Sequence, residues 1–270
     1  MQKRPLHALV LLLALGFMPA LRANLVLHLT FDQPADLSAD SSENSHAATL
    51  TLGTLTSVAG GVSGGAAAFG GSSYVGWGAA VGDTLAGSFS VSLWLRTTTP
   101  FGIWDYEPAY YGAGIVYADV PGQTNDAIPL ALVGTRGAFM TSDGVQDTTI
   151  HTTSPLTTGQ WIHVVSTYDI ATGAKRLYYN GVLQATETVN PTPVNARHQL
   201  YLGANTSDGR FFTGELDEFQ LHTGVLTEAD VAFLHAHPGL TLIPEPASLA
   251  LLAGALGLAL RSIRRRACGA

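Results

Sequence analysis

The sequence has 270 residues, a formal net charge of −7 at pH 7 and a single cysteine. Between residues 24 and 243, only 6 basic side chains stand against 19 acidic ones, a net charge of −13. This acidity disfavours nucleic acid and anionic membranes as partners, because both require a basic surface. The only cysteine, Cys268, lies near the C-terminus. We therefore predict that residues 24–243 hold no internal disulfide and depend on their core and a metal ion for stability.

The first 23 residues have three parts. Lys3 and Arg4 precede an apolar run over Leu9–Phe17, and small residues follow at Ala20 and Ala23. A basic start, a short apolar stretch and a small-residue cleavage site together are typical of a secretory signal peptide. We predict that residues 1–23 are this signal, cut after Ala23, with Ala20 as the alternative.

Beyond residue 23, apolar and polar residues alternate in short runs. Leu25, Leu27 and Leu29 share one face of a predicted first strand, and a polar loop follows over 36–46. No stretch before residue 227 keeps a 3.6-residue apolar period for three turns, so the body is predicted to be all-β. Short strands separated by Gly, Asn and Asp turns favour an antiparallel two-sheet sandwich. Further strands are predicted at 66–69, 74–77, 89–96 and 200–203.

The segment 97–130 is the least regular part of the chain. It combines aromatic and acidic residues with four prolines, which favour loop over strand. The clearest local signal comes later, where Asn180-Gly181 stands between two apolar runs. This pair is typical of a type I′ turn, so a hairpin is predicted over 176–183.

The last strand is predicted over 214–221, where Phe219 and Leu221 alternate with polar neighbours. Thr227 and Asp230 have the spacing of a capping box, which predicts a short helix that ends before Pro238.

At the C-terminus, Pro244-Glu245-Pro246 precedes an apolar run over 247–260 and a cluster of four arginines. A helix of this length would span about 21 Å, short of a bilayer core of about 30 Å. The tail over 244–270 resembles the PEP-CTERM sorting signal of Gram-negative bacteria. The resemblance implies processing by an exosortase-type enzyme, transient or anchored inner-membrane contact through 247–260, and delivery outside the cell or to its surface. An ordinary C-terminal membrane anchor is the alternative, and the arginines would be cytoplasmic in both cases.

Four stretches, in order, resemble a laminin-G-like (concanavalin A-like lectin/glucanase) jelly-roll domain. They are Leu27–Asp32 with Asp40–His46, Phe89–Leu95, Trp161–Asp169 running into Leu177–Gly181, and Gly214–Leu221 with the helix start at Thr227. The resemblance implies one domain over 24–243, an all-β antiparallel two-sheet jelly-roll sandwich with one short helix after the closing strand. Such folds host lectins, enzymes and structural modules, so function must be argued from a site.

A calcium site is the first candidate. Asp32 ends the first strand, Asp40 and Asn44 lie in the following loop, and Asp217 lies on the last strand. The terminal strands of such a jelly roll are neighbours, so these oxygen ligands, which Ca²⁺ prefers, would converge. The resemblance implies a structural calcium with carboxylates from Asp32 and Asp217 and mainly carbonyls from 44–46. Alternatively, Asp40 and Asn44 only form turns and Asp217 is an ordinary strand residue.

Glycoside hydrolysis is the second candidate. Some jelly-roll glucanases carry Glu-x-Asp-x-x-Glu on a strand, and residues 215–220 match except that Gln220 replaces the second glutamate. An amide cannot transfer the proton that retaining hydrolysis needs. Glu218 is expected on the other face of a regular strand from Glu215. We therefore predict that the protein is not an enzyme.

A ligand surface over 101–126 is the third candidate. Trp104 and Tyr106 offer rings that stack on sugars, and Asp119, Asn125 and Asp126 offer acceptors for sugar hydroxyls or for a second cation. The alternative is that the aromatic residues cover the sheet. The histidines have no metal-binding spacing and are expected to be structural or solvent-facing.

Together these features predict an exported noncatalytic module that binds carbohydrate or matrix components at the cell surface or in extracellular polymer, with calcium stabilising the fold. A structural or protein-adhesion module without glycan affinity is the first alternative, and a glycoside hydrolase is the second.

Overall fold

The computed structural model describes residues 23–194 and 197–242. The chain divides into a compact unit that ends at Leu240 and a separate unit over Thr241–Ala270, and the account below concerns the first. The predicted signal peptide, except Ala23, and the predicted sorting tail lie outside the described residues. Within the described ranges, no helix is long and apolar enough to cross a membrane.

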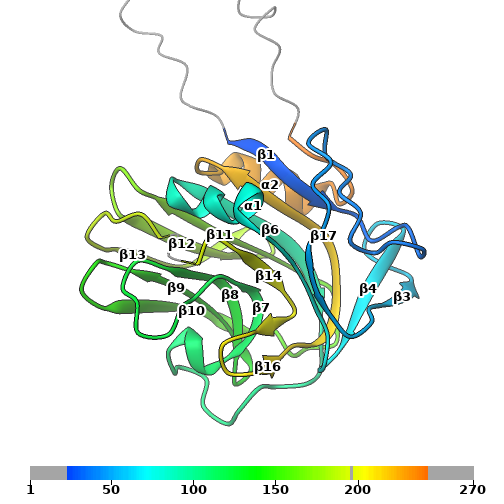
Figure 1. Ribbon diagram of the computed structural model, residues 1–270, viewed down its shortest axis with the longest axis horizontal. Coiled ribbons are helices and arrows are strands. Elements are labelled where there is room, and N and C mark those ends of the chain that lie inside the picture. The colour runs from blue at the N-terminus through cyan, green and yellow to red at the C-terminus, as the bar shows by residue number, and fades with distance from the viewer. Residues whose placement is uncertain (1–22, 195–196, 243–270) are drawn as a thin grey trace, which may run out of the picture. The chain divides into compact units, whose positions relative to one another are not determined.

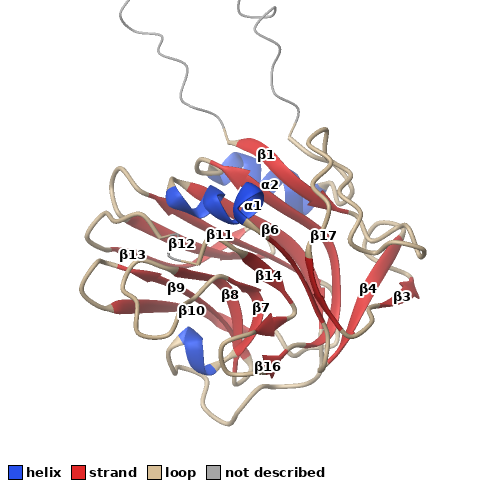
Figure 2. Cartoon of the chain, in the orientation of Figure 1, coloured by secondary structure: helices blue, strands red, loops and turns tan. Residues whose placement is uncertain are grey.

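Strands dominate this unit, and they form two sheets (Figures 1 and 2). Sheet A has the order β13 (Val182–Thr188), β12 (Ala174–Tyr179), β11 (Ile162–Asp169), β6 (Phe89–Arg96), β17 (Thr213–Thr223), β4 (Gly65–Gly70) and β3 (Thr56–Ala59), and β1 (Asn24–Leu29) also pairs with β17. Sheet B has the order β10 (Asp147–Pro155), β9 (Arg136–Ser142), β8 (Ala127–Val133), β7 (Ala113–Tyr117), β14 (Leu200–Leu202), β5 (Tyr74–Trp77) and β2 (Leu50–Leu52), with β15 (Ala204–Asn205) and β16 (Arg210–Phe211) beside β7. The predicted two-sheet antiparallel sandwich is confirmed.

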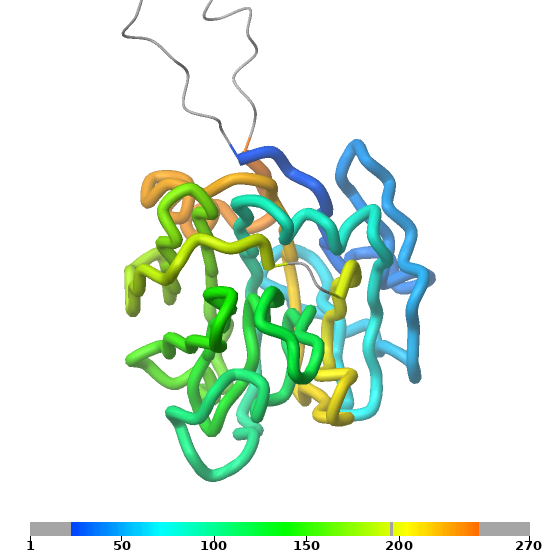
Figure 3. Tube along the Cα trace, turned by 60° about the vertical axis from the view of Figure 1, so that its left-hand side comes forward, coloured from blue at the N-terminus to red at the C-terminus, as the bar shows by residue number. Residues whose placement is uncertain are grey.

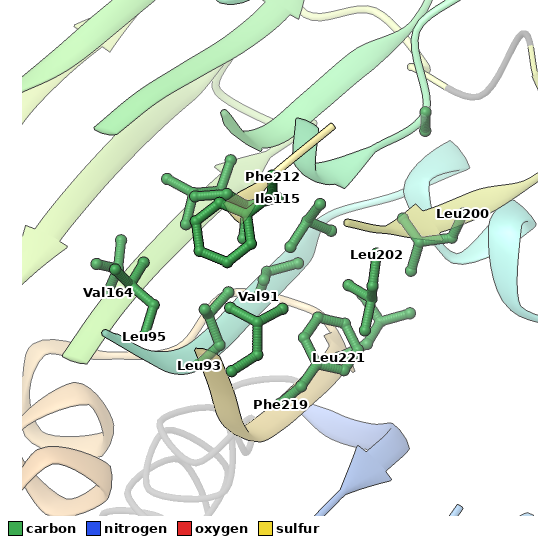
Figure 4. Close-up of a cluster of buried hydrophobic side chains, with 14 of the residues drawn as sticks. Val91, Leu93, Leu95, Ile115, Val164, Leu200, Leu202, Phe212, Phe219 and Leu221 are labelled. Carbon is green, nitrogen blue, oxygen red and sulfur yellow. The ribbon is translucent and has the colours of Figure 1, made fainter. Parts of the chain in front are cut away.

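The core lies between the sheets. Leu93 and Leu95 of β6 and Phe219 of β17 meet Ile115 of β7 and Leu202 of β14 (Figure 4). All five side chains are fully buried. Burying apolar surface at about 25 cal/mol per Å² is the main force holding the sheets together.

Strand β17 organises sheet A, because it pairs with β1, β4 and β6. The first and last strands therefore lie side by side, as predicted (Figure 3). The strand is not regular, however: its register with β6 shifts between Asp217 and Gln220, and Glu218 has φ of 48°. The simple alternation expected for Glu215 and Glu218 fails because this bulge inserts an extra residue.

Helix α2 (Glu228–Ala236) begins at the predicted capping box, with Thr227 as the N-cap and both reciprocal hydrogen bonds to Asp230 present. The Asn180-Gly181 turn also joins β12 and β13, and Asn180 has φ of 48°. One short α-helix and two 3-10 turns were not predicted. They are α1 (Ala79–Gly82), η1 (Asp83–Ala86) and η2 (Ala109–Tyr111).

The segment 97–130 is less of a loop than its prolines indicate. It contains all of β7 and the start of β8, both of which are buried. Strand β7 lies between β8 and β14 in the middle of sheet B. The apolar run Ala113–Tyr117 is short and is surrounded by turn-forming residues, so the sequence pattern does not identify it as a strand. Packing between β8 and β14 stabilises it in the strand conformation.

Candidate functional site

The outer face of sheet B carries a second, smaller cluster of side chains. Alternation along β7 and β9 sends Val116 and Phe139 into the core but Tyr117 and Met140 to the opposite face. A pocket of about 220 Å³ lies at one end of this face, lined by Tyr110, Asp119, Pro121, Gly122, Asp147 and Asp208. We call it the tyrosine–aspartate pocket.

A hydrogen-bond network supports this pocket from below. The Tyr117 hydroxyl donates to Asp119 Oδ2 at 2.6 Å, and the Val120 amide donates to Asp126 Oδ2 at 2.8 Å. Ser142 Oγ lies 2.9 Å from Asp126 Oδ1 and 2.5 Å from Asp147 Oδ1. A hydroxyl has one proton and cannot donate to both carboxylates at once, so a proton on one of the two carboxyl groups completes the network.

Burial shifts the pKa of the carboxyl groups in this network. Desolvation raises the pKa of Asp126 to about 7, and the nearby charge of Asp119 adds to the effect. Burial also raises the pKa of Asp119, with Asp147 as a further cause. A raised pKa favours the neutral form, and a neutral Asp119 carboxyl would both donate and accept hydrogen bonds at the pocket.

Tyr110, which lines the pocket, belongs to a cluster with Tyr111 and Arg210. The rings of Tyr110 and Tyr111 lie 4.7 Å apart between centroids, and the Arg210 guanidinium lies 5.3 Å from the Tyr111 ring. Arg210 and Asn205 both donate to the Tyr110 carbonyl, at 2.8 and 3.0 Å. These bonds fix the η2 turn, so Tyr111, which is half exposed, is presented on a rigid support.

The predicted ligand residues divide between two places. Asp119 lines the tyrosine–aspartate pocket, Asp126 is buried behind it, and Asn125 is exposed on the connecting loop. Trp104 and Tyr106 are 65% and 66% exposed at the other end of β8, and the structure does not bring them to the pocket.

That other end of β8 has its own contacts. The Trp104 carbonyl lies beside Gly134, and the Tyr106 ring packs against Arg136 and His151.

Several pocket residues were missed in the sequence. Tyr110 and Tyr111 are adjacent aromatic residues in the segment already singled out, which is a usable signal. Asp147 begins β10 and Asp208 precedes β16, so nothing local connects either to Asp119.

The four predicted calcium ligands also divide into two pairs. Asp217 Oδ2 accepts from the amides of Val62 and Ser63, at 2.7 and 3.1 Å, and Asp32 Oδ1 accepts from Gly65 at 2.7 Å. Both carboxylates thus face the β3–β4 turn.

The other pair lies along β1. Asp40 accepts from the amides of His28, Ser42 and His46, at 2.8 to 3.1 Å, and Asn44 donates to the Leu25 and Val26 carbonyls. Among the described residues, no three His, Cys, Asp or Glu side chains form a group that would hold a metal. Asp40 and Asn44 contact different chain segments from Asp32 and Asp217, and calcium binding stays a prediction.

The glucanase-like motif forms structural contacts. Arg96 Nε donates to Glu215 Oε2 at 2.5 Å, and Nε2 of the Gln220 side chain donates to the Leu240 carbonyl at 2.9 Å. Glu218 is buried, with its Oε2 2.7 Å from His28 Nε2. The motif thus lacks the second carboxyl that retaining hydrolysis needs.

Several solved structures share this architecture. Domain 4 of AbnA, an extracellular GH43 arabinanase from Geobacillus stearothermophilus solved with arabinotriose, is 26% identical with a TM-score of 0.60, over 79% of this chain and 98% of that one. The binding domain of Paraclostridial Mosquitocidal Protein 1 is 17% identical with a TM-score of 0.59, over 78% and 52%. The binding domain of botulinum neurotoxin serotype D/C is 16% identical with a TM-score of 0.59, over 78% and 51%. This chain therefore spans about half of each toxin chain, and those two likenesses concern the fold alone.

No curated protein matches the chain. A family model does: it covers residues 69–232, from β4 to the middle of α2, and its match includes every residue that lines the tyrosine–aspartate pocket. The chain therefore belongs to the Laminin_G_3 family of the concanavalin A-like lectin/glucanases superfamily.

Proposed function

We propose that this protein is an exported, noncatalytic carbohydrate-binding module whose glycan site is the tyrosine–aspartate pocket. The observation that supports it best is the pocket itself, where Tyr110 and the carboxyls of Asp119, Asp147 and Asp208 meet on the outer face of sheet B. The arabinanase domain, which is similar over nearly its whole length, was solved with arabinotriose. That likeness supports a neutral sugar as the ligand.

The pocket would bind a sugar in two ways. The exposed part of the Tyr110–Tyr111 pair offers an apolar ring surface to the C–H face of a sugar. The carboxyl groups accept from its hydroxyls, and each well-made bond with a charged partner contributes about 1.5–3 kcal/mol. At 220 Å³ the pocket is small, so it would hold one or two sugar units of a longer chain.

Titration of the full chain with arabinotriose, xylotriose, cellotriose and mannotriose by calorimetry tests this proposal. We expect binding of at least one, weakened about tenfold or more in Tyr110→Ala and in Asp147→Asn. Tyr106→Ala is the matched control, because Tyr106 is an exposed tyrosine outside the pocket and its loss should leave affinity unchanged. Equal affinity in all three variants would place the site elsewhere, and no binding to any glycan would overturn the proposal.

A protein-adhesion module is the second candidate. Ile103 and Trp104 are 85% and 65% exposed on the loop that follows β6. Adjacent exposed apolar side chains are typical of protein contact sites. If adhesion is the function, Trp104→Ala should abolish capture of a partner while added sugar has no effect.

We also propose that calcium stabilises the domain; of the four ligands expected from the sequence, Asp32, Asp40, Asn44 and Asp217, the pair Asp32 and Asp217 carries the proposal. The observation that supports it is that both carboxylates face the β3–β4 turn. Export through the predicted signal peptide and processing of the tail by an exosortase-type enzyme belong to the same proposal.

A further inference from the structure

A larger cavity lies on sheet A, where β6 ends and β17 begins. It is an open depression of about 410 Å³, and its lining includes Arg96, Thr98, Thr99, Gly159, Thr213 and Glu215. None of these residues lines the tyrosine–aspartate pocket, whose walls belong to the sheet B side of the sandwich. We call it the threonine cavity. Its volume falls within the range of about 300–1,000 Å³ that is typical of small-molecule sites.

Three separate chain segments are tied together around this cavity. Thr97 Oγ1 donates to the Thr213 carbonyl at 2.7 Å, and the Gly159 amide donates to the Thr97 carbonyl at 2.9 Å. Gly214 has φ of 156°, and a Cβ there would lie 2.6 Å from the Phe212 ring. The floor therefore requires glycine, and the walls are held in place before any ligand arrives.

An ion pair forms one wall. Arg96 Nε donates to Glu215 Oε2 at 2.5 Å, and the guanidinium carbon lies 4.7 Å from the centroid of the Trp161 ring. Stacking on the indole and the bond to the carboxylate hold the guanidinium plane in one orientation. The two charges balance, so the wall offers fixed donors and acceptors without a net charge.

Threonine side chains line the rest of the cavity, with the Thr98 methyl group toward Gly159 and the Thr213 hydroxyl toward Gly71. Thr98, Thr99 and Thr213 are all exposed at the cavity, whereas Thr97 is buried and holds the walls together. Hydroxyls that both donate and accept, beside a guanidinium donor and a carboxylate acceptor, match neighbouring hydroxyls on a sugar ring. A net anionic ligand would be opposed by Glu215, and a net cationic one by Arg96.

We propose that the threonine cavity is a second glycan site, for neutral sugar units with neighbouring hydroxyls, and that the protein bridges two polysaccharide chains. The bridging step rests on the proposed function of the tyrosine–aspartate pocket. Two weak sites on one rigid body raise the effective affinity for a polymer without any new contact. A module of this kind would cross-link an extracellular matrix.

Counting sites tests the proposal. We expect the full chain to bind two molecules of a neutral trisaccharide that it recognises, from the panel above, by calorimetry. Tyr110→Ala should leave one site, Thr99→Trp should leave the other, and the double variant should leave none, because a tryptophan at position 99 fills the cavity. Thr54→Trp is the control, since Thr54 is exposed and lies outside both cavities.

The outcomes separate the two proposals. Loss of all binding in Tyr110→Ala would overturn the second site and leave the proposed function standing. Binding that survives Tyr110→Ala and disappears in Thr99→Trp would support the threonine cavity alone. Light scattering of a soluble neutral polysaccharide mixed with protein should peak at an intermediate ratio, and each single variant should reduce that peak about tenfold or more.

Specificity provides a second test. In Glu215→Gln the side chain keeps its shape but no longer balances Arg96, so the cavity becomes cationic. We expect this variant to gain about tenfold or more in affinity for a trigalacturonate at the threonine cavity, measured in the Tyr110→Ala background. An unchanged preference for neutral over acidic sugars would show that the ion pair does not contact the ligand and would overturn the assignment.

Discussion

The outer faces of the two sheets differ in what covers them. On sheet A, helix α2 packs over β6 and β11, so that His235 stacks on Trp94 and on His163 with centroids 5.6 and 5.8 Å apart. Sheet B has no such helix, and its outer face opens into the tyrosine–aspartate pocket. Helix α2 thus seals part of the outer face of sheet A, whereas the threonine cavity on the same sheet and the tyrosine–aspartate pocket on sheet B stay open.

Burial shifts the pKa of titratable groups on both sheets. Beneath α2, burial lowers the pKa of His163 to about 3, and on β17 it lowers that of His222 to about 4, so both are neutral near pH 7. On sheet B, burial raises the pKa of Asp126 to about 7. Desolvation disfavours the charged form in each place, so it favours neutral histidines on sheet A and neutral carboxyls on both sheets, since burial also raises the pKa of Asp217 on β17 to about 7.

The largest expected effect comes from removing Trp94, which packs between sheet A and helix α2. Trp94 is 8% exposed, stacks on His235 and packs against the tilted ring of His163, so Trp94→Ala should lower the free energy of unfolding by about 3–5 kcal/mol. Trp104→Ala, at a side chain that is 65% exposed, should change it by less than about 0.5 kcal/mol. Urea unfolding at pH 7 measures both, and similar losses would contradict the contrast between sealed and open regions.

The second-largest expected effect is destabilisation by acid, through the buried histidines of sheet A. The folded pKa of His163 and His222 lies below the unfolded value of about 6.5, so the unfolded chain binds more protons between the two values. Their contribution to stability is complete above pH 6.5 and is lost as the pH falls toward 4 and then 3, by up to about 1.4 kcal/mol per pH unit for each. Urea unfolding between pH 7 and 4 measures the slope, which should be smaller in His163→Gln.

Asp126 should act in the opposite direction. Its folded pKa of about 7 lies above the ordinary value, so its protonated form stabilises the fold at low pH and this contribution is lost as the pH rises from about 4 through 7. In Asp126→Asn this pH dependence should disappear, so that the free energy of unfolding falls less steeply with rising pH, by up to about 1.4 kcal/mol per pH unit. Comparing the pH dependence of unfolding in the two proteins tests it, and parallel curves would show that Asp126 is ionised.

The smallest effect concerns calcium. With a dissociation constant of about 10⁻⁴ M, millimolar calcium would stabilise the domain by about 1.4 kcal/mol. We expect a melting temperature that rises with calcium and falls with chelator, and a response that disappears in Asp217→Asn but not in Glu43→Ala, an exposed control in the loop that holds Asp40 and Asn44. A chelator-insensitive melting temperature in the wild type would make the calcium prediction wrong.

Local features of the chain were predictable because their causes lie within a few residues. The Asn180-Gly181 turn needs a positive φ beside a tight hairpin, and the Thr227–Asp230 capping box satisfies amides within one turn of helix. The alternation in β1 and β17 depends on one buried face per strand. These signals, with the family resemblance, were enough for the sandwich.

The candidate site was predictable only in part. Asp119 stood out as an acidic residue in an aromatic segment, and it does line the pocket. Trp104 and Tyr106 stood out for the same reason, but β8 places them at the opposite end of the sheet. Sequence proximity does not report that separation, because a strand of seven residues spans about 23 Å.

What the sequence by itself determined is the first and last strands and several between them, the Asn180-Gly181 turn, the capped helix and the acidity of the domain, since each depends on neighbouring residues or on composition. Only the tertiary structure decided that Asp147 and Asp208 join Asp119, that a bulge turns Glu218 toward His28, and that Asp32 and Asp217 separate from Asp40 and Asn44. Strand pairing sets these placements, because it brings together residues more than a hundred positions apart in the chain. The register of each pair is chosen so that the apolar face of the whole strand is buried, which no local stretch of sequence specifies.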